Sequence, residues 1–255
     1  MNLLGIETAT DVCSVALLSD DDAVAEIHLM RPRSHAEMLV PMIEHVLRLA
    51  HLSPGDVEVV AVSIGPGSYT GLRIGVSAAK GFAFGVGAQI LGVPSLDALA
   101  LNVSRNADEG DHLIPAHAAR GDEVYAGLWR VGREVQPDGG GSWAGEGGVT
   151  LELVRETEAL SVSDAVEWLA ALGPGRIWLA GSGGQAIVTA SRGAATEGAD
   201  LRVSNVHPSA AGVARLGLKM LRGGTNHDVA SLEPLYLKEF IAKKQQRSIF
   251  ERLPF

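Results

Sequence analysis

A glycine-rich segment in the first third of the chain constrains the fold most. The continuously apolar run Val57–Ile64 leads directly into Gly65-Pro66-Gly67-Ser68-Tyr69-Thr70-Gly71, and small residues in a helical pattern follow. An uninterrupted, β-branched apolar run is typical of a strand buried on both faces, and glycine with proline ends it in a tight loop. The segment therefore predicts a strand, a loop and a helix N-terminus, which is the repeating unit of an α/β fold.

The loop belongs to neither of two familiar catalytic motifs. It lacks the Lys-Ser/Thr pair that closes a P-loop, and Pro66 precedes Gly67 where a G-x-S-x-G nucleophile elbow needs glycine. No histidine or acid is placed by the sequence to activate Ser68 or Thr70, so we interpret both as loop hydrogen-bonding residues. The unpaired N–H groups of a helix N-terminus suit an anion or a close-packed neighbour, and both interpretations stay open.

Composition and charge exclude several classes of protein. The 255 residues, 46% of them hydrophobic and few aromatic, suit α/β layers in one large domain or two small ones. A net charge of −9 argues against a broad phosphate-binding surface. Cys13 is the only cysteine, which excludes an intramolecular disulfide and a cysteine-based zinc site. We recognise no leader peptide and no run long enough to span a bilayer, so we expect a cytoplasmic protein.

The first half of the chain is predicted to hold three strands, a helix, the buried strand and two further helices. Ser34 and Glu37 have the spacing of a capping box at the start of the first helix. The predicted elements are strands Leu3–Thr8, Val12–Leu18, Ala23–Met30 and Val57–Ile64, and helices from Ser34 to His51, Gly71–Val86 and Ser95–Val103.

The second half repeats this order more loosely, and Gly181-Ser182-Gly183-Gly184 opens one of its helices. The predicted elements are strands His112–Ala118, Glu123–Val131, Val149–Val154, Arg176–Ala180 and Asp200–Val203, and helices Val162–Leu172, one from Gly181, and Pro208–Leu221. We interpret 132–148 as a mobile surface hairpin loop. The repetition indicates duplicated halves at 1–103 and 104–225 with a cleft between them, followed by a tail at 226–255. Within this tail we interpret a basic group as solvated: Lys238, Lys243, Lys244, Arg247 and Arg252.

Several blocks now resemble known families. Gly5-Ile6-Glu7-Thr8-Ala9-Thr10 with Cys13-Ser14-Val15-Ala16-Leu17 resembles the first phosphate-loop hairpin of the acetate kinase/Hsp70/actin superfamily, whose duplicated RNase H-like halves enclose an interdomain cleft. Four further blocks, in the right order along the whole chain, are similar to the bacterial TsaB (YeaZ) family: the segment from Arg33-Ser34-His35 to Ile43, the Gly65–Gly75 loop, Asp122-Glu123-Val124-Tyr125, and Glu233-Pro234-Leu235-Tyr236-Leu237.

This resemblance implies a non-catalytic scaffold and activator that forms a heterodimer with its paralogue TsaD. TsaD transfers a threonylcarbamoyl group from its adenylate onto N6 of adenosine 37 in tRNAs that read ANN codons. The resemblance further implies the ATPase TsaE as a partner of the heterodimer, TsaC as the source of the adenylate, tRNA as a partner through the complex, and a homodimer when the chain is alone.

The residues favour the absence of a catalytic centre. Two histidines four apart on a helix ligate a metal in the paralogue, and Ser95 and Leu99 stand at those positions here. Ala118 replaces the aspartate that most relatives carry in Asp-Ala-Arg, and Glu7 at a usual aspartate position does not restore a site. His117, next to Ala118, is interpreted as a structural or surface histidine. We therefore expect no metal and no cofactor, and no peptidase motif is present.

Two groups of residues are candidates for the remaining functions. An inherited nucleotide site, with weak binding of ATP or ADP left open, would use Thr8, Thr10, Gly181, Ser182, Gly183 and Gly184. A partner interface on the two long helices of the first half would use His35, Met38, Met42, His45, Arg73, Gly75, Ser77 and Lys80. His35 and His45 are ten residues apart and are not expected to share a metal. The alternative is an independent small-molecule kinase or ATPase of the same fold, which would need carboxylates facing the cleft from both halves.

Overall fold

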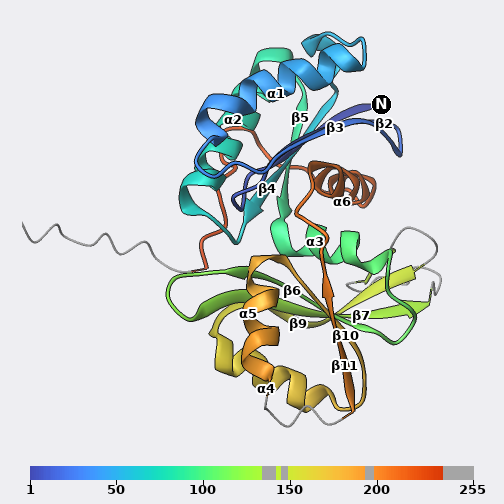
Figure 1. Ribbon diagram of the computed structural model, residues 1–255. Helices are drawn as coiled ribbons and strands as arrows, with labels where there is room; N and C mark the ends of the chain where they lie inside the picture. Colours follow the sequence, from blue (N-terminus) through green and yellow to red (C-terminus); the bar gives the residue numbers. More distant parts are fainter. Residues whose placement is uncertain (134–141, 145–148, 193–197, 238–255) are drawn as a thin grey trace, which may run out of the picture.

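The computed structural model describes residues 1–133, 142–144, 149–192 and 198–237. These residues form two α/β lobes, one above the other in Figure 1, each built around its own sheet. The predicted duplication of an α/β half is confirmed. The prediction of a loop at 132–148 falls largely outside the described residues.

The sheet of the first lobe has the strand order β3-β2-β1-β4-β5. β1 is antiparallel to β2 and parallel to β4, so a meander is extended by parallel strands that cross over through helices. Four of the strands were predicted, and β5 was missed because it lies within an apolar, glycine-rich stretch. The strands are β1 (Asn2–Glu7), β2 (Cys13–Ser19), β3 (Asp22–Leu29), β4 (Val59–Gly65) and β5 (Gln89–Pro94).

The sheet of the second lobe has the order β11-β10-β6-β7-β9-β8 and follows the same plan. β6, β7 and β9 are antiparallel neighbours, and β10 and β11 are added parallel to β6. The strands are β6 (His112–Ala118), β7 (Glu123–Arg133), β8 (Ser142–Ala144), β9 (Val149–Ser161), β10 (Gly175–Ala180) and β11 (Ala199–Ser204).

Within the described residues, six α-helices cover the faces of these sheets. α1 and α2 lie together on one face of the first sheet, α6 covers its other face, and α4 and α5 pack together on the outer face of the second sheet (Figure 1). The helices are α1 (His35–Leu49), α2 (Tyr69–Val86), α3 (Ser95–Ser104), α4 (Val162–Leu172), α5 (Gly181–Ser191) and α6 (Ala210–Arg222), with a 3-10 turn at Pro54–Asp56. None of the helices in the described part of the chain combines the length and apolar character that a membrane crossing requires.

The two halves exchange helices. α3 follows the first sheet in sequence but packs against β6 of the second, while α6 follows the second sheet and packs against β1 and β2 of the first. Gly5 permits this approach, because a Cβ there would lie 2.2 Å from the carbonyl oxygen of Ala210. The predicted division at residues 103 and 104 therefore does not separate the lobes in space: α6 belongs structurally to the first lobe.

The starts of α1 and α2 test two local predictions, of which one is wrong and one is confirmed. The Ser34–Glu37 capping box does not form: the Ser34 hydroxyl instead donates to the carbonyl of Arg31 at 2.6 Å. α2 is capped by Ser68, whose Oγ accepts from the Gly71 N–H. Ser68 therefore has the loop hydrogen-bonding role predicted for it.

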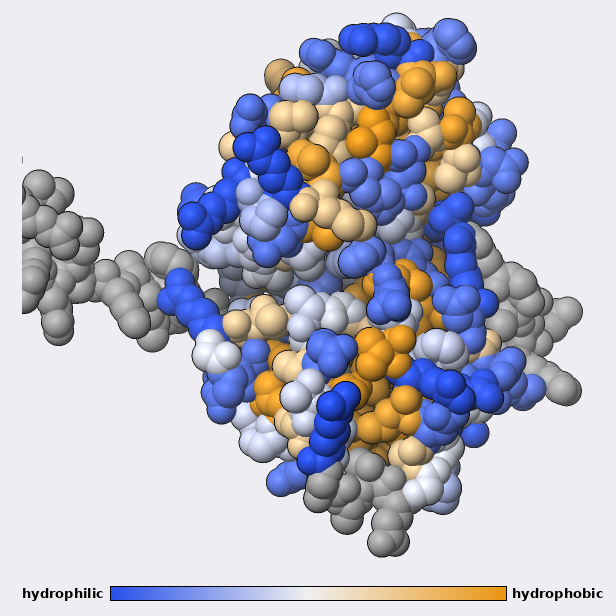
Figure 2. All heavy atoms as spheres, viewed as in Figure 1, coloured by the Kyte–Doolittle hydropathy of each residue, from blue (hydrophilic) through white to orange (hydrophobic). Residues whose placement is uncertain are grey.

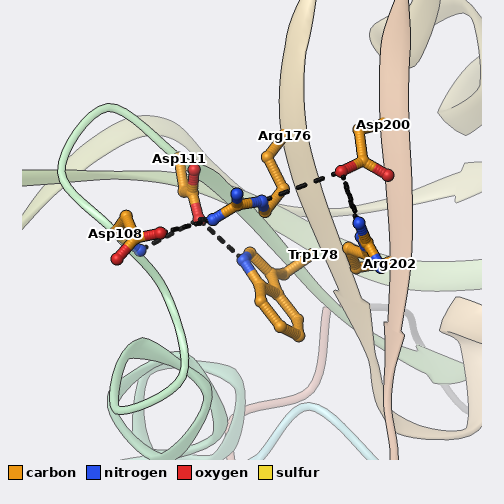
Figure 3. Close-up of polar contacts among 6 residues, drawn as sticks. All are labelled: Asp108, Asp111, Arg176, Trp178, Asp200 and Arg202. Atoms are coloured by element: carbon orange, nitrogen blue, oxygen red, sulfur yellow. Dashed lines mark hydrogen bonds and ion pairs between the residues drawn. The ribbon is translucent and has the colours of Figure 1, made fainter.

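A polar network joins the loop before β6 to the strands β10 and β11 of the second sheet (Figure 3). The buried carboxylate of Asp111 accepts from the indole N–H of Trp178 at 2.8 Å and from the backbone N–H of Asp108 at 3.0 Å. Arg176 contacts both aspartates, and Asp200 lies between Arg176 and Arg202. The network joins the loop before β6 to the N-terminal ends of β10 and β11. The C-terminal ends of these two strands are not part of it and lead into the site described below.

The segment that follows α6 returns across the first lobe, and we call residues 226–237 the strap. Its Leu232 side chain is buried against the first sheet, and the Leu235 N–H donates to the carbonyl of Ile64 at 2.7 Å. Lys80 of α2 donates to the carbonyls of Ala230 and Leu232. The strap therefore packs on the first lobe, and the basic group from Lys238 onward lies outside the described residues.

Candidate functional site

A cleft of about 920 Å³ lies between the two lobes, at the waist visible in Figure 2. The turn between β1 and β2 and the glycine loop before α2 form its wall in the first lobe. The turn between β6 and β7, the start of α5 and the chain between β11 and α6 form its wall in the second. It is lined by residues 9–12, 66–70, 117–120, 181–182, 203–208 and 235–237, together with Glu123, Tyr125 and Gln185.

Half of the residues predicted for an inherited nucleotide site do line this cleft. Thr10 does so from the first lobe, and Gly181 and Ser182 from the second. The Ser182 hydroxyl accepts from the N–H of Ala118 at 2.9 Å, which holds the β6–β7 turn against the start of α5. These residues shape the wall of the cleft.

The other three residues, Thr8, Gly183 and Gly184, do not line the cleft. Thr8 is fully buried, with its Oγ1 against the backbone of α2 at Gly75. Gly183 packs against Ala116, and Gly184 against Leu179. The lack of side chains at Gly183 and Gly184 allows close packing between α5 and the second sheet.

Glu7 at the end of β1 is also directed into the lobe. Its Oε1 accepts from the Ala9 N–H at 2.5 Å and from the Ser63 hydroxyl at 3.1 Å. Burial raises the pKa of Glu7 to about 7, although these hydrogen bonds oppose the shift. The buried Glu7 carboxyl group therefore holds the β1–β2 turn in place through these hydrogen bonds, and it does not line the cleft.

His117 lies at the base of the cleft and is almost completely buried, with a ring nitrogen close to Gly181. Desolvation lowers the pKa of His117 to about 4, so the imidazole is neutral at pH 7. Within the described part of the chain its ring nitrogens have no hydrogen-bond partner. The interpretation as a structural histidine agrees with this burial, whereas a surface position was wrong.

The positions of the paralogue's metal histidines have structural roles here. The Ser95 hydroxyl accepts from the Gly65 N–H at 3.0 Å and so supports the glycine loop, and Leu99 is a core residue between the lobes. Among the described residues no three histidine, cysteine, aspartate or glutamate side chains gather in a way that could hold a metal ion.

A second hollow, of about 740 Å³, lies between α1 and α2 and is mostly apolar. Val40, which lines it, is 55% exposed, and Phe84 on α2 is 83% exposed. Gly81 and Gly85 present bare backbone on the same side of α2, with no atom within 4 Å of where a Cβ would stand. Phe84 is three residues after Gly81 on α2, so it is a neighbour of Gly81 on the helix surface. We call the surface formed by the hollow and Phe84 the helix-pair face, and the hollow is lined by Val40, Ile43, Glu44, Leu47, Arg48, Leu52, Pro54, Ala78, Gly81, Phe82, Gly85 and Val86.

Some of the residues predicted for the partner interface are exposed on α1 and α2, and others are buried. His45, Arg73 and Ser77 are exposed, and Met38 and Lys80 are half-buried. His35, Met42 and Gly75 are buried within the lobe, so they cannot contact a partner directly, and Met42 packs in the core behind α1. Sequence reasoning missed Val40 and Phe84, although both interrupt the polar side of an otherwise amphipathic helix.

The architecture defines the class. Two α/β lobes that exchange helices around a cleft form the duplicated, actin-like fold that was predicted from the sequence. A family model described as TsaD, tRNA N6-adenosine threonylcarbamoyltransferase, matches residues 29–141. Among solved structures, a Pseudomonas aeruginosa protein described as similar to peptidase YEAZ superposes with a TM-score of 0.73 at 28% identity, covering 93% of this chain and 99% of that chain.

The relatives found by sequence comparison identify the family within this class. The protein from Escherichia coli K12 called tRNA threonylcarbamoyladenosine biosynthesis protein TsaB is 32% identical over 96% of this chain and 98% of its own length. A Bacillus subtilis protein of the same name is 35% identical over 51% of this chain and 56% of its own. The chain belongs to the TsaB family.

Proposed function

We propose that this chain is a non-catalytic activator in the formation of N6-threonylcarbamoyladenosine on tRNA, and that it acts by pairing with TsaD through the helix-pair face. The observation that carries the proposal is the exposure of Phe84 and Val40 beside an apolar groove on α1 and α2. A contiguous apolar hollow of this size on a monomer marks a protein–protein contact. The exposed glycines of α2 allow close approach of a second helix pair, and a paralogue with equivalent helices would supply one.

An activator works by binding one state of its partner more tightly than the other. We propose that the heterodimer then presents a surface to the ATPase TsaE and to tRNA, that TsaC supplies the adenylate, and that the chain itself needs no metal or cofactor. The same face would support a homodimer when TsaD is missing, because paralogous surfaces pair about a twofold or pseudo-twofold axis.

Replacement of Phe84 tests the face directly. Phe84→Asp replaces an exposed apolar side chain next to the helix-pair face by a charge that the proposed contact would have to desolvate, so we expect the dissociation constant for TsaD to rise at least about a hundredfold. Isothermal titration calorimetry with purified TsaD measures it. Because Phe84 is exposed in the free chain, the melting temperature should change little.

Val154→Asp is the matched control, since Val154 is a half-exposed apolar residue on β9 of the other lobe. It should bind TsaD as the unmodified chain does. Equal binding by the Phe84 and Val154 variants would remove the helix-pair face from the proposal.

One observation favours a second candidate, the independent kinase or ATPase. Asp11 of the first lobe and Glu123 of the second both line the cleft, which is the arrangement of carboxylates that such an enzyme needs. ATP turnover by the purified chain, lost in Asp11→Asn and in Glu123→Gln, would establish this activity. Turnover at the level of the buffer would leave the activator as the sole proposal.

A further inference from the structure

His117, at the base of the cleft, is a buried polar side chain that the proposed function does not use. It is 1% exposed, and neither of its ring nitrogens makes a hydrogen bond to a described residue. Burying a polar group without a partner costs free energy, so a buried imidazole normally has one. Desolvation lowers the pKa of His117 to about 4, against a smaller opposite effect of the Ala116 backbone. The neutral ring therefore has one nitrogen that donates and one that accepts.

The His117 ring faces the start of α5. Its Nδ1 lies 3.2 Å from the point where a Cβ of Gly181 would stand, and Gly181 is the first residue of this helix. The N-cap residue is Ala180, which has no side-chain oxygen to cap the helix. The first N–H groups of a helix have no partner within it and form the positive end of its dipole. The helix start and the imidazole therefore offer N–H donors to the same corner of the cleft.

Ser182 adds a hydroxyl group to this corner. Its Oγ accepts from the Ala118 N–H at 2.9 Å, and the hydroxyl proton can be donated to a third group. The Cδ2 atom of the buried Leu99 lies 3.0 Å from the same Cβ point of Gly181, so the core closes the inner side of the corner. Hydrogen bonds and charges act more strongly next to such an apolar surface than in water.

The charges along the cleft limit the charge of a ligand. Its lining residues include one arginine, Arg120, and two acids, Asp11 and Glu123. The N-terminus of a helix adds the equivalent of roughly half a positive charge. One negative charge placed at the start of α5 is therefore favourable, whereas a polyphosphate would meet a wall with more acids than arginines.

We infer that the corner formed by His117, Ser182 and the start of α5 binds the carboxylate group of a small organic acid. One carboxylate oxygen accepts from the N–H groups of α5, and the other accepts from the imidazole N–H and the Ser182 hydroxyl. A carboxylate carries a single charge and accepts several hydrogen bonds through two oxygens, which matches these donors.

The inference goes beyond the proposed function, because it concerns a ligand that the isolated chain binds. The residues that line the cleft and those of the helix-pair face are different. Loss of carboxylate binding and loss of TsaD binding are therefore separable by mutation, and Phe84→Asp should bind a carboxylate as the unmodified chain does.

An NMR titration of the labelled full chain with sodium acetate tests the inference, with the ionic strength held constant by sodium chloride. We expect the ring resonances of His117, assigned by their loss in His117→Gln, and the amide resonance of Ser182 to shift to saturation. His117→Leu removes the imidazole donor, so the acetate dissociation constant read from Ser182 should rise at least about tenfold. His117→Gln keeps an N–H donor and should weaken binding by about threefold at most.

Two further variants complete the set. His207 is an exposed histidine that lines the cleft from the chain between β11 and α6, and His207→Ala should bind acetate as the unmodified chain does. Ser182→Ala changes an exposed side chain and so tests the corner without altering the core. It should raise the acetate dissociation constant at least about threefold.

Three results would overturn the inference. The first is an absence of saturable shifts with acetate, or equal shifts with sodium chloride alone. The second is acetate binding that both His117→Leu and Ser182→Ala leave unchanged, since the imidazole would then be only a core residue. The third is tighter binding of inorganic phosphate or ATP than of acetate at the same ionic strength, because the corner would then favour more than one negative charge.

Discussion

At the scale of single residues, the buried carboxyl group of Glu7 is the most informative. It occupies a position where a cleft-facing acid is expected from the superfamily, yet it accepts hydrogen bonds from Ala9 and Ser63 inside the lobe. Its pKa of about 7 in the folded chain lies above the value of about 4.3 for an unfolded chain. Folding therefore favours the protonated form, and the stability that this provides is lost as the pH rises from about 4.3 to 7.

Glu7→Gln should consequently stabilise the protein at alkaline pH. The amide oxygen can accept the same hydrogen bonds but carries no charge, so at pH 8 we expect a gain of about 2 to 4 kcal/mol in the free energy of unfolding and almost none at pH 4. Urea unfolding at both pH values measures it. Glu37→Gln on the exposed side of α1 is the control, and a gain of the same size in both variants or at both pH values would contradict the role assigned to Glu7.

At the scale of elements, the contact between α2 and β1 depends on the pair Gly75 and Thr8. A Cβ at position 75 would lie 2.1 Å from Thr8 Oγ1, and that hydroxyl has no hydrogen-bond partner among the described residues. The helix thus approaches the strand as closely as a glycine allows. This contact explains why two residues assigned by sequence to different functions are both buried.

Gly75→Ala should destabilise the chain by about 1 to 3 kcal/mol, because the added methyl group forces the helix away from β1. In a Thr8→Ala background the cost should fall by at least half, since the opposing hydroxyl is gone, and the two changes should not add. Thermal unfolding of the four variants completes the cycle. Gly81→Ala on the same helix meets no atom within 4 Å and should stabilise by about 0.5 to 1 kcal/mol. Additive effects of Gly75→Ala and Thr8→Ala would show that the contact is looser than described.

The elements also show what could be predicted from the sequence. The strands of both meanders and the helices that cover them follow from apolar periodicity and from Gly and Pro at the ends. The exchange of α3 and α6 could not be predicted, because it depends on which sheet offers the better apolar surface, a tertiary property that no local window contains. For the same reason sequence reasoning placed Thr8 and Gly183 in the cleft: a small residue beside a ligand and one beneath a helix look alike in sequence.

For the helix-pair face, the sequence indicated the helices but not the exposed residues on them. The sequence indicated α1 and α2 as the partner helices, but it selected Met42 and Gly75, which the fold buries. Phe84 and Val40 were overlooked because a hydrophobic residue on the polar side of a helix is visible only once the buried side is known. Burial, which decides between core and interface, is the information that the structure adds.

At the scale of the whole molecule, the fold has two lobes around a cleft, while the most exposed large apolar side chain in the described part of the chain, Phe84, lies on an outer helix of one lobe. The proposed function uses that surface, whereas an enzyme would use the cleft. These two uses predict different effects of cleft mutations on tRNA modification. An activator acts only together with TsaD, so tRNA modification should continue when Asp11 and Glu123 of this chain are neutralised.

The most direct test is a reconstitution in which TsaC, TsaD, TsaE, tRNA, labelled threonine, bicarbonate and ATP are combined with and without this chain, and the label on tRNA is counted. We expect label with the chain and with its Asp11→Asn variant, and at most a trace without the chain or with Phe84→Asp at the same concentration. Equal labelling with and without the chain would contradict its role as an activator.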